Sequence, residues 1–476
     1  MYVDVTFQDW ERTPEAERPR LLRDIIAGYK ASPEFTAGLT ANQYFRGDNT
    51  VVAQKTILKA RKIEYKDASG RTRTRAGTQD VVGNRIASSF LFRFVTQQNQ
   101  FLLSEGVTLK DDATKAALGH DFDEQLEKLG EKALLHGVAW GFWNAGHLEI
   151  IEAVKDALSG AVALVDERTS APMVLVQFWQ IGPERPTYVR LYELQGVTEY
   201  RIVKDQVELI TPTRAYIVRT HTDALGTVVT GASNYPVLPV RPLGANAERR
   251  SELTVSIKSK IDAYDRILSD FADNLDRAND VYWVLNNFGG TMDEVAELLE
   301  QINRVKAVAN LSDGTGTAST AEPHTIEVPY AAREKALDLL ERALYQDYMA
   351  LDMDELTGGS LTNVAIRAAT ANINMKANRY EWQVRQFVRE ILALIGRPTD
   401  EIRFKRQTIA NESETVQDIA VMRQDIDLET ALKLNPYITQ EEMQQIMANK
   451  DAEAHTGAPT MDELDRLMAT ARQAAQ

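Results

Sequence analysis

The chain has 476 residues, a formal net charge of −15 from 54 Lys and Arg against 69 Asp and Glu, and no cysteine. The missing cysteine excludes a disulfide-stapled secreted fold, thiolate zinc sites, iron–sulfur clusters and cysteine nucleophiles. With 44% hydrophobic and 26% charged residues the sequence is globular, and at about 150 residues per domain its length predicts about three domains. The acid excess argues against a protein that coats itself with nucleic acid through a generally basic surface.

No stretch of the sequence has the length of a membrane-spanning helix. The most apolar stretches, Ala133–Trp143 and Val384–Gly396, fall short of the ~20 apolar residues that such a helix needs. The N-terminal residues lack the basic region and apolar run of a secretory signal. We therefore expect a soluble protein that is made in a reducing cytosol and has no membrane partner.

The first half of the chain predicts a mixed α+β unit. Apolar residues at helical spacing indicate helices over residues 15–31, 80–103 and 121–139, and a turn-rich piece that carries Tyr44–Asn49 follows the first helix. Alternating apolar and polar residues then indicate strands in two stretches, 140–182 and 186–241.

Residues Lys55–Arg75 form a basic segment with eight cationic and two acidic side chains, a net charge of +6. A turn signal at Asp67–Gly70 divides it. Its one aromatic residue, Tyr65, offers no ladder on which bases could stack. Two interpretations stay open, a solvated loop or a contact with a polyanion or a protein partner.

Two long helices with a small mixed piece between them open the second half. A continuous apolar stripe predicts the first helix from Ser251, and Pro329 begins the second, which runs to about Asp352. The stripe consists of Leu253, Ile257, Ile261, Tyr264, Leu268, Phe271 and Leu275. Between the helices we expect strands at Tyr282–Leu285, Ala307–Leu311 and Thr325–Val328, a helix at Asp293–Arg304 and a loop at Asp313–Thr320.

A third long helix and an acidic tail complete the chain. After a break at Gly358–Gly359, Leu361–Gly396 predicts the helix, which Gly396 and Pro398 end. Glu401–Ile409 predicts a lone strand that must find its partner elsewhere in the fold. The tail, 410–476, reads as helical and has a net charge of −8.

No group of side chains forms a recognisable catalytic motif. The six histidines share no metal-ligand spacing, and the loop Gly314–Thr317 lacks the third glycine and the helix of a phosphate-binding loop. Asp352, Asp354 and Glu355 bring three carboxylates into four residues, which suits either a divalent-cation site or a solvated helix end. The apolar stripes are likewise open to two interpretations, core packing or subunit packing.

Several segments of this chain, in their order, resemble tailed-bacteriophage portal proteins, especially those of siphophages that infect Gram-positive hosts. The resemblance covers about residues 20–450, and the run IDAYDRILSDFADNLD is the most telling part of it. Where the family usually has a Ser-Gly pair and a Lys, this chain has Thr362–Arg367. The other matching segments are RDIIAGYKAS with NQYFRGDNTVV, GNRIASSFLFRFVTQQNQFLLSEGVTL, LEKLGEKALLHGVAWGFW, YPVLPVRPLGANAERRSELTVSIKSK and NESETVQDIAVMRQDIDLETALKLNPYITQEEMQQI.

The resemblance implies a helix-rich, mixed α+β fold with five kinds of domain: an α/β wing, two long stem helices, a small α/β clip, a long tunnel or wing helix and a helical crown. Mapped onto this sequence, the wing is 1–250 with strand 401–409 returning to it, the stem helices are 251–277 and 329–352, and the clip is 278–328. The tunnel loop is 353–363, the long wing helix 364–400, the crown 410–450 and the C-terminal tail 451–476.

The function implied is that of a structural ring without catalysis or cofactor. About twelve copies would stand at one vertex of the capsid in the virion and conduct double-stranded DNA during packaging and ejection. The implied partners are the terminase motor, the capsid or scaffolding protein and the neck or adaptor proteins. The DNA-facing loop would comprise Thr357, Gly358, Gly359, Ser360, Leu361, Thr362 and Asn363, and the possible channel charges are Lys258, Lys335, Arg342, Asp352, Asp354 and Glu355.

Two other functions stay open from the residues alone. One is a metal-dependent nucleic-acid enzyme that uses Asp352, Asp354 and Glu355. The other is a helical scaffold protein with no role in DNA handling.

Overall fold

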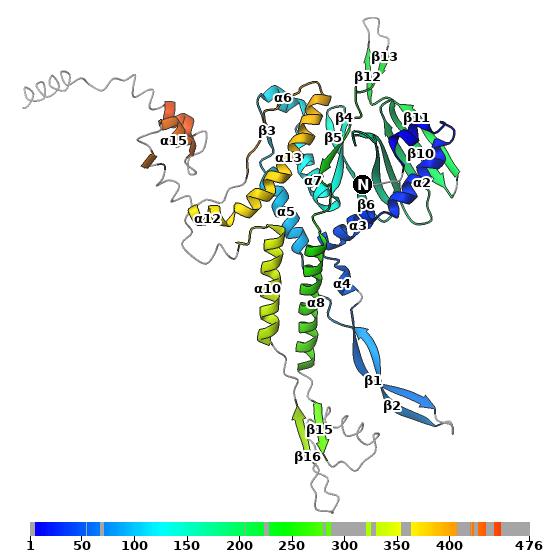
Figure 1. Ribbon diagram of the computed structural model, residues 1–476, viewed down its shortest axis with the longest axis vertical. Coiled ribbons are helices and arrows are strands. Elements are labelled where there is room, and N and C mark those ends of the chain that lie inside the picture. Colours follow the sequence, from blue (N-terminus) through cyan, green and yellow to red (C-terminus); the bar gives the residue numbers. More distant parts are fainter. Residues whose placement is uncertain are drawn as a thin grey trace, which may run out of the picture. The chain divides into compact units, whose positions relative to one another are not determined.

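The structure is a computed structural model that mixes helix and sheet (Figure 1). It describes residues 5–53, 55–66, 71–204, 206–222, 228–278, 282–286, 320–324, 330–353, 363–406, 419, 421–422, 427–434 and 442–448. The chain divides into two compact units, which are described separately below. The first comprises Met1–Ala350 and Met375–Gln407, and the second Leu351–Asn374 and Thr408–Gln476.

Four helices begin the first unit, and three of them were not predicted. Helix α2 (Arg18–Lys30) confirms the first predicted helix, whereas α3 (Pro33–Phe45) occupies most of the piece that was read as turn-rich. Ser32 begins α3 because its side chain accepts a hydrogen bond from the Phe35 N–H, and Pro33 suits the first helical position. The other two helices that were not predicted are α1 (Phe7–Arg12) and α4 (Thr50–Ala53).

The basic segment forms a two-stranded antiparallel ribbon. Strands β1 (Thr56–Lys66) and β2 (Thr72–Val82) pair from Thr56 with Val82 to Lys66 with Thr72. The many Thr, Ile and Tyr residues favour strand over loop. The helix predicted from residue 80 therefore begins later, at Phe90, as α5 (Phe90–Leu103).

Both predicted strand-rich stretches are confirmed, and they build two larger sheets and a two-stranded one. The larger is antiparallel with the order β11-β10-β9-β8-β7-β6, and the smaller has the order β14-β4-β5. The strands of the larger sheet are β6 (Val154–Asp156), β7 (Ser159–Val165), β8 (Pro172–Gln180), β9 (Thr187–Glu193), β10 (Gly196–Val203) and β11 (Gln206–Arg214). The smaller sheet consists of β4 (Val138–Asn144), β5 (His147–Glu152) and β14 (Val240–Gly244), and β12 (Ile217–Thr222) pairs with β13 (Val228–Ser233).

Apolar side chains from both faces of the larger sheet pack in separate clusters. On one face Val176 and Leu191 pack with Leu22, Ile25 and other residues of the N-terminal helices. On the other face Leu175 and Tyr192 pack with Trp140 of the smaller sheet. The larger sheet is therefore buried on both sides over its central strands.

A third cluster joins helices that are far apart in the sequence. It contains Phe94 of α5, Leu126 of α7 (Phe122–His136) and Phe387 of α13 (Ala371–Leu394). Helix α7 ends at Gly137, whose φ of 85° lies in the left-handed region that suits glycine, and β4 begins at the next residue. This cluster is the largest of the three. It also contains residues from the two long helices of the second half of the chain, Ile257 and Ile261 from the first and Leu344 and Tyr348 from the second.

The lone strand near the C-terminus has its partner in the first half of the chain. Strand β17 (Ile402–Phe404) pairs antiparallel with β3 (Val107–Leu109), which precedes helix α6 (Asp112–Ala117). It is shorter than the predicted 401–409.

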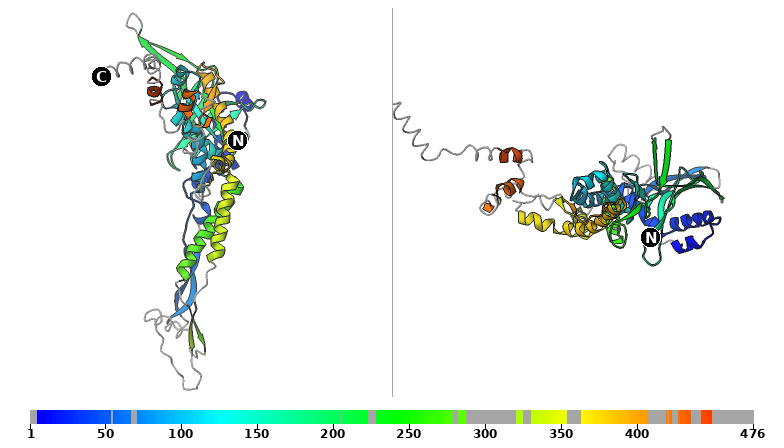
Figure 2. Two further views of the ribbon diagram at one scale, coloured as in Figure 1. Left: turned by 90° about the vertical axis from the view of Figure 1, so that its left-hand side faces the viewer. Right: turned by 90° about the horizontal axis from the view of Figure 1, so that it is seen from above.

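The two long helices are α8 (Val255–Ala278) and α10 (Tyr330–Tyr348), which lie side by side in Figures 1 and 2. Helix α10 ends four residues before the predicted Asp352, and Met349 follows it with a φ of 62°. Beyond them, β15 (Tyr282–Asn286) confirms one predicted strand and pairs with β16 (Thr320–His324). The predicted elements 293–304, 307–311 and 325–328 lie outside the described residues.

The second unit contains short helices. The third long helix was predicted as one piece from Leu361 to Gly396, but α12 (Asn363–Ala369) is separated from α13 at Thr370. The Thr370 hydroxyl donates to the Ile366 carbonyl, which also accepts the Thr370 N–H, so the side chain shares an acceptor of the regular helix. In the tail, α15 (Leu428–Leu434) and residues 442–448 are helical.

The described helices include none with both the length and the apolar character required to cross a membrane.

Candidate functional site

The helix pair α8 and α10 carries three of the predicted site residues. Its apolar contact follows the predicted stripe, since Ile257 and Ile261 of α8 and Leu344 of α10 are buried in one cluster. Farther along, the rings of Phe271 and Tyr330 meet edge to face with centroids 5.7 Å apart. The apolar residues become more exposed toward the C-terminal end of α8, where Leu275 is 41% exposed.

A second stripe on α8 is polar and was not predicted. Its members are separated by three, four, four and three residues, so they lie on one face of the helix. This spacing can be read from the sequence, and it is the signal from which the polar stripe could have been predicted. The polar stripe comprises Asp262, Asp265, Ser269, Asp273 and Asp276. Asp265 and Ser269 have no exposed surface, and Asp273 is buried.

The polar stripe binds residues 84–88, an extended segment that we call the strap. The strap leads from β2 to α5, and its backbone bonds to side chains of α8. The Asn84 N–H donates to Asp273 Oδ1 at 2.7 Å, the Ile86 N–H to Ser269 Oγ at 3.0 Å and the Ser88 N–H to Asp265 Oδ1 at 2.9 Å. Buried carboxylates thus satisfy backbone donors that no sheet or helix would satisfy.

The residues before β1 bind the same helix. Lys55 Nζ lies 2.6 Å from Asp273 Oδ2 and 2.9 Å from Asp270 Oδ1. The Asn49 side-chain amide donates to Asp265 and to the Ser88 carbonyl. Helix α8 therefore holds both ends of the β1–β2 ribbon.

The pKa values of the stripe follow from burial and hydrogen bonding. Burial raises the pKa of the Asp265 carboxyl, and the hydrogen bonds from Asn49 and Ser88 offset this only in part. Burial acts on Asp273 as well, but the bonds from Lys55 and from Asn84 outweigh it and lower the pKa of that carboxyl. Both groups are occupied as hydrogen-bond acceptors, which is a structural role.

A buried ion pair joins the N-terminal end of α8 and the C-terminal end of α10 to α13. Lys376 Nζ lies 2.8 Å from Glu252 Oε2, donates to the Tyr348 carbonyl at 2.8 Å and sits over the Tyr348 ring. Burial lowers the pKa of Lys376, and Glu252 opposes that shift. Glu252 precedes α8, Tyr348 ends α10 and Lys376 is near the start of α13, so one ammonium group ties three segments together.

The predicted channel charges differ in their surroundings. Lys258 is paired with Asp262 at 2.6 Å and lies over the Tyr44 ring. Lys335 and Arg342 are exposed on α10. Asp352 is half-buried in the second unit. Asp354, Glu355 and Thr357–Thr362 lie outside the described residues, and Asn363 is the first residue of α12.

The structure brings no catalytic group together in the part that it describes. Among those residues, no three or more His, Asp or Glu side chains are arranged to hold a metal ion. His136 is the last residue of α7 and is buried, and its Nε2 lies 2.9 Å from Asn42 Oδ1. Its role there is packing within the fold.

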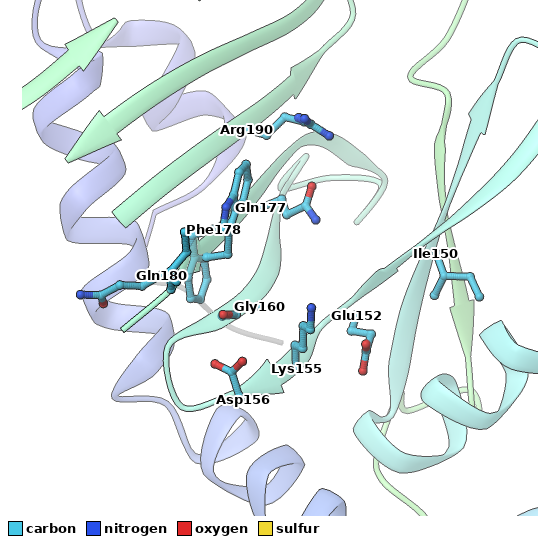
Figure 3. Close-up of a pocket in the computed structure, with 12 residues that line it drawn as sticks. Ile150, Glu152, Lys155, Asp156, Gly160, Gln177, Phe178, Gln180 and Arg190 are labelled. Atoms are coloured by element: carbon cyan, nitrogen blue, oxygen red, sulfur yellow. The ribbon is translucent and has the colours of Figure 1, made fainter. Parts of the chain in front are cut away.

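A groove of about 490 Å³ opens between the two sheets (Figure 3). Glu152 and Lys155 line one side, and Gln177 and Arg190 the other. Burial raises the pKa of Glu152. Arg190 is already paired with Glu199 at 2.9 Å, and the described lining includes no histidine, so the groove lacks a nucleophile with its base.

Comparison with known proteins identifies relatives along most of the chain. The family model described as "Phage portal protein, SPP1 Gp6-like" matches residues 36–456. The portal protein of Clostridium phage phiCD119 is 23% identical over 341 residues, which cover 66% of this chain and 72% of that protein. The portal protein of Bacillus phage SPP1 is 25% identical over 420 residues, which cover 83% of this chain and 80% of that protein.

Proposed function

Because this chain belongs to the SPP1 Gp6-like family of phage portal proteins, we propose that about twelve copies form a ring at one vertex of the capsid. The ring conducts double-stranded DNA into the head during packaging and out of it during ejection. The observation that carries this proposal is the family match, which extends over residues 36–456 and so includes both long helices and the elements around them.

The division of the chain into portal domains is part of the proposal. The wing comprises 1–250 with the strand near 401–409, the stem helices correspond to α8 and α10, and the clip lies between them at 278–328. The pairing of β17 with β3 supports the return of the late strand to the wing. The long wing helix is assigned to 364–400, where α12 and α13 lie, and the crown is assigned to 410–450.

The tunnel surface is proposed at the loop 353–363 and on α10. The segment Thr357–Asn363 carries no charge and consists mostly of small polar residues, which suits a surface that must let DNA slide. Lys335 and Arg342 are the favoured channel cations because both are exposed on α10. Lys258 is disfavoured because Asp262 neutralises its charge.

A conduit should hold DNA weakly. Each contact between a cation and a phosphate releases counterions and adds affinity, which would oppose sliding. An acidic wall with few cations avoids this, and the net charge of −15 per copy agrees with such a wall.

The proposed partners are the terminase motor, the capsid or scaffolding protein and the neck or adaptor proteins. The protein would be assembled in the host cytoplasm and reside in the virion. No cofactor is required, since the conduit performs no chemistry.

Electron microscopy of the purified full chain tests the proposal. Negative-stain images should show annular particles with a central hole, and about twelve copies of 53.3 kDa give roughly 640 kDa by light scattering. Particles of one or two copies without a central hole would contradict the ring.

The family match does not favour the alternative of a metal-dependent enzyme, because the portal family is structural. A direct test is nuclease activity with Mg²⁺ in the wild type and in an Asp352→Ala/Asp354→Ala variant. We expect no cleavage by either protein. Cleavage that the double substitution abolishes would establish the enzyme instead.

A further inference from the structure

Two arginines of the first unit lie against one flank of α13 with a single carboxylate between them. Arg241 belongs to β14, where it is opposite Gly141 of β4. A Cβ on Gly141 would come within 2.5 Å of the Phe387 ring, so the sheet approaches α13 closely at this point. The side chain of Arg241 is only 16% exposed, and its Nε is buried without a hydrogen bond.

The second arginine comes from the turn that follows β14. Arg249 has a φ of 53°, in a turn that Asn246 closes by accepting the Arg250 N–H at 2.9 Å. Its Cγ lies 3.5 Å from the position of a Cβ on Gly244, next to Gln383 of α13. The turn therefore directs this half-buried arginine to the same flank of α13.

The charge of this cluster is not balanced among the described residues. Glu390 of α13 is the carboxylate that acts on both arginines, and it lies 3.9 Å from Arg241 Nε. One of its oxygens also accepts a hydrogen bond from Gln386 at 2.7 Å. Burial lowers the pKa of Arg241 and of Arg249, and Glu390 opposes both shifts. Two guanidinium groups and one carboxylate leave a net charge of +1.

A half-buried guanidinium group remains charged at any physiological pH, so it requires an anion or pays a desolvation penalty. Its planar fork matches a carboxylate or a phosphate, with two parallel hydrogen bonds. One more carboxylate would complete a network of two arginines and two acids with no net charge.

We infer that Arg241 and Arg249 form an anion site that binds a carboxylate side chain of a neighbouring copy of this chain. The inference rests on the ring proposed above, in which each copy presents one flank to the next. A neighbouring copy offers abundant carboxylates, since the chain has 69 acidic residues against 54 basic ones. A DNA phosphate is less suitable, because a site that grips DNA would slow its passage.

Assembly of the full chain tests the site. R241Q/R249Q should raise the protein concentration needed for half-maximal ring formation by about tenfold or more, because a desolvated ion pair between copies is lost. R250Q is the matched control, since Arg250 is exposed in the same turn and should assemble as the wild type does. R249Q alone keeps the Arg241–Glu390 pair, so an intermediate effect in a normally folded protein argues against misfolding.

Unchanged assembly of a folded R241Q/R249Q variant would overturn the inference while the ring proposal stands. Absence of rings in the wild type would overturn the ring proposal and this assignment with it. The two failures are therefore distinguishable.

Photocross-linking identifies the anion. The photoreactive amino acid p-benzoylphenylalanine would replace Arg249 in rings assembled from a mixture of ¹⁴N- and ¹⁵N-labelled copies. Cross-linked peptide pairs that mix the two labels, with an Asp or Glu at or beside the linked position, would support the site. Cross-links only within one copy, or cross-links to added DNA, would overturn it.

Discussion

At the scale of single residues, burial decides what the charged groups of this protein do. Lys376 and Glu252 pair inside the molecule, and each is less than one-sixth exposed. Removing one member of such a pair costs more than removing both, because a lone buried charge retains its desolvation penalty.

The first prediction concerns this ion pair. Lys376→Met should lower the free energy of unfolding by about 3–5 kcal/mol, because Glu252 is left unpaired. Adding Glu252→Gln should restore much of the loss. Urea denaturation of the wild type, both single variants and the double variant gives the coupling energy.

Lys335→Met provides the control, since this exposed lysine should change stability by only about 0.5 kcal/mol or less. Strictly additive effects of the Lys376 and Glu252 substitutions would show that the pair does not interact.

The second prediction concerns His136. Burial lowers the pKa of His136 to about 3, against an ordinary value near 6.5. Between these values the unfolded chain binds a proton that the folded chain does not, so stability falls as the pH falls. The slope is roughly 1 kcal/mol per pH unit. From pH 6.5 to pH 5, His136→Gln should therefore lose less stability than the wild type in chemical denaturation.

The exposed His120 supplies the control. His120→Gln should keep the pH dependence of the wild type. Parallel pH profiles for the wild type and His136→Gln would mean that His136 does not remain neutral in the folded protein.

At the scale of elements, two faces of α8 make different contacts. The apolar stripe packs toward α10, and the polar stripe holds the strap and the base of the β1–β2 ribbon. A two-stranded ribbon alone is marginally stable in water, so its anchorage to a long helix matters for its position.

The third prediction follows from this anchorage. Asp273→Ala should accelerate hydrogen exchange of the Asn84, Ile86 and Ser88 amides by about tenfold or more, because the substitution removes the acceptor of Asn84 and the partner of Lys55. Hydrogen–deuterium exchange with mass spectrometry measures this over peptides that span the strap. Asp338→Ala, on the exposed face of α10, should leave the exchange unchanged. Equal exchange in the Asp273 variant and the wild type would contradict the role of the polar stripe.

At the scale of the whole molecule, the acid excess would have two functions in the proposed ring. In a ring of about twelve copies, −15 per chain becomes a formal charge on the order of −180. Part of that charge is buried or half-buried, because Asp262, Asp265 and Asp273 bond within the subunit. The remaining excess is available to repel DNA phosphates.

The fourth prediction concerns the proposed tunnel loop. Deletion of residues 357–361 should leave ring formation intact but impair DNA packaging or retention, because the loop is proposed to contact DNA rather than a neighbouring copy. Electron microscopy assesses the rings, and a packaging assay assesses the DNA. Loss of rings in this deletion would show that the loop is required for assembly instead.

The sequence alone determined the local elements with a strong period. The apolar stripe from Ile257 to Leu275 specified α8, and alternation specified the strands of both sheets, because one buried face imposes its period on the chain. The resemblance of ordered segments led to the family that the comparison shows. The periodicity of the sequence did not predict α3, because the start of this helix depends on Ser32 and Pro33 rather than on an apolar stripe.

The tertiary structure alone decided which distant residues meet. No period indicates that β17 pairs with β3, that the strap binds the polar stripe of α8, or that Lys376 reaches Glu252. These contacts join residues more than a hundred positions apart, and each gives a polar group a partner that offsets the cost of taking it out of water. A sequence pattern records which face of an element is buried, but the partner that covers that face is set only when the chain has folded.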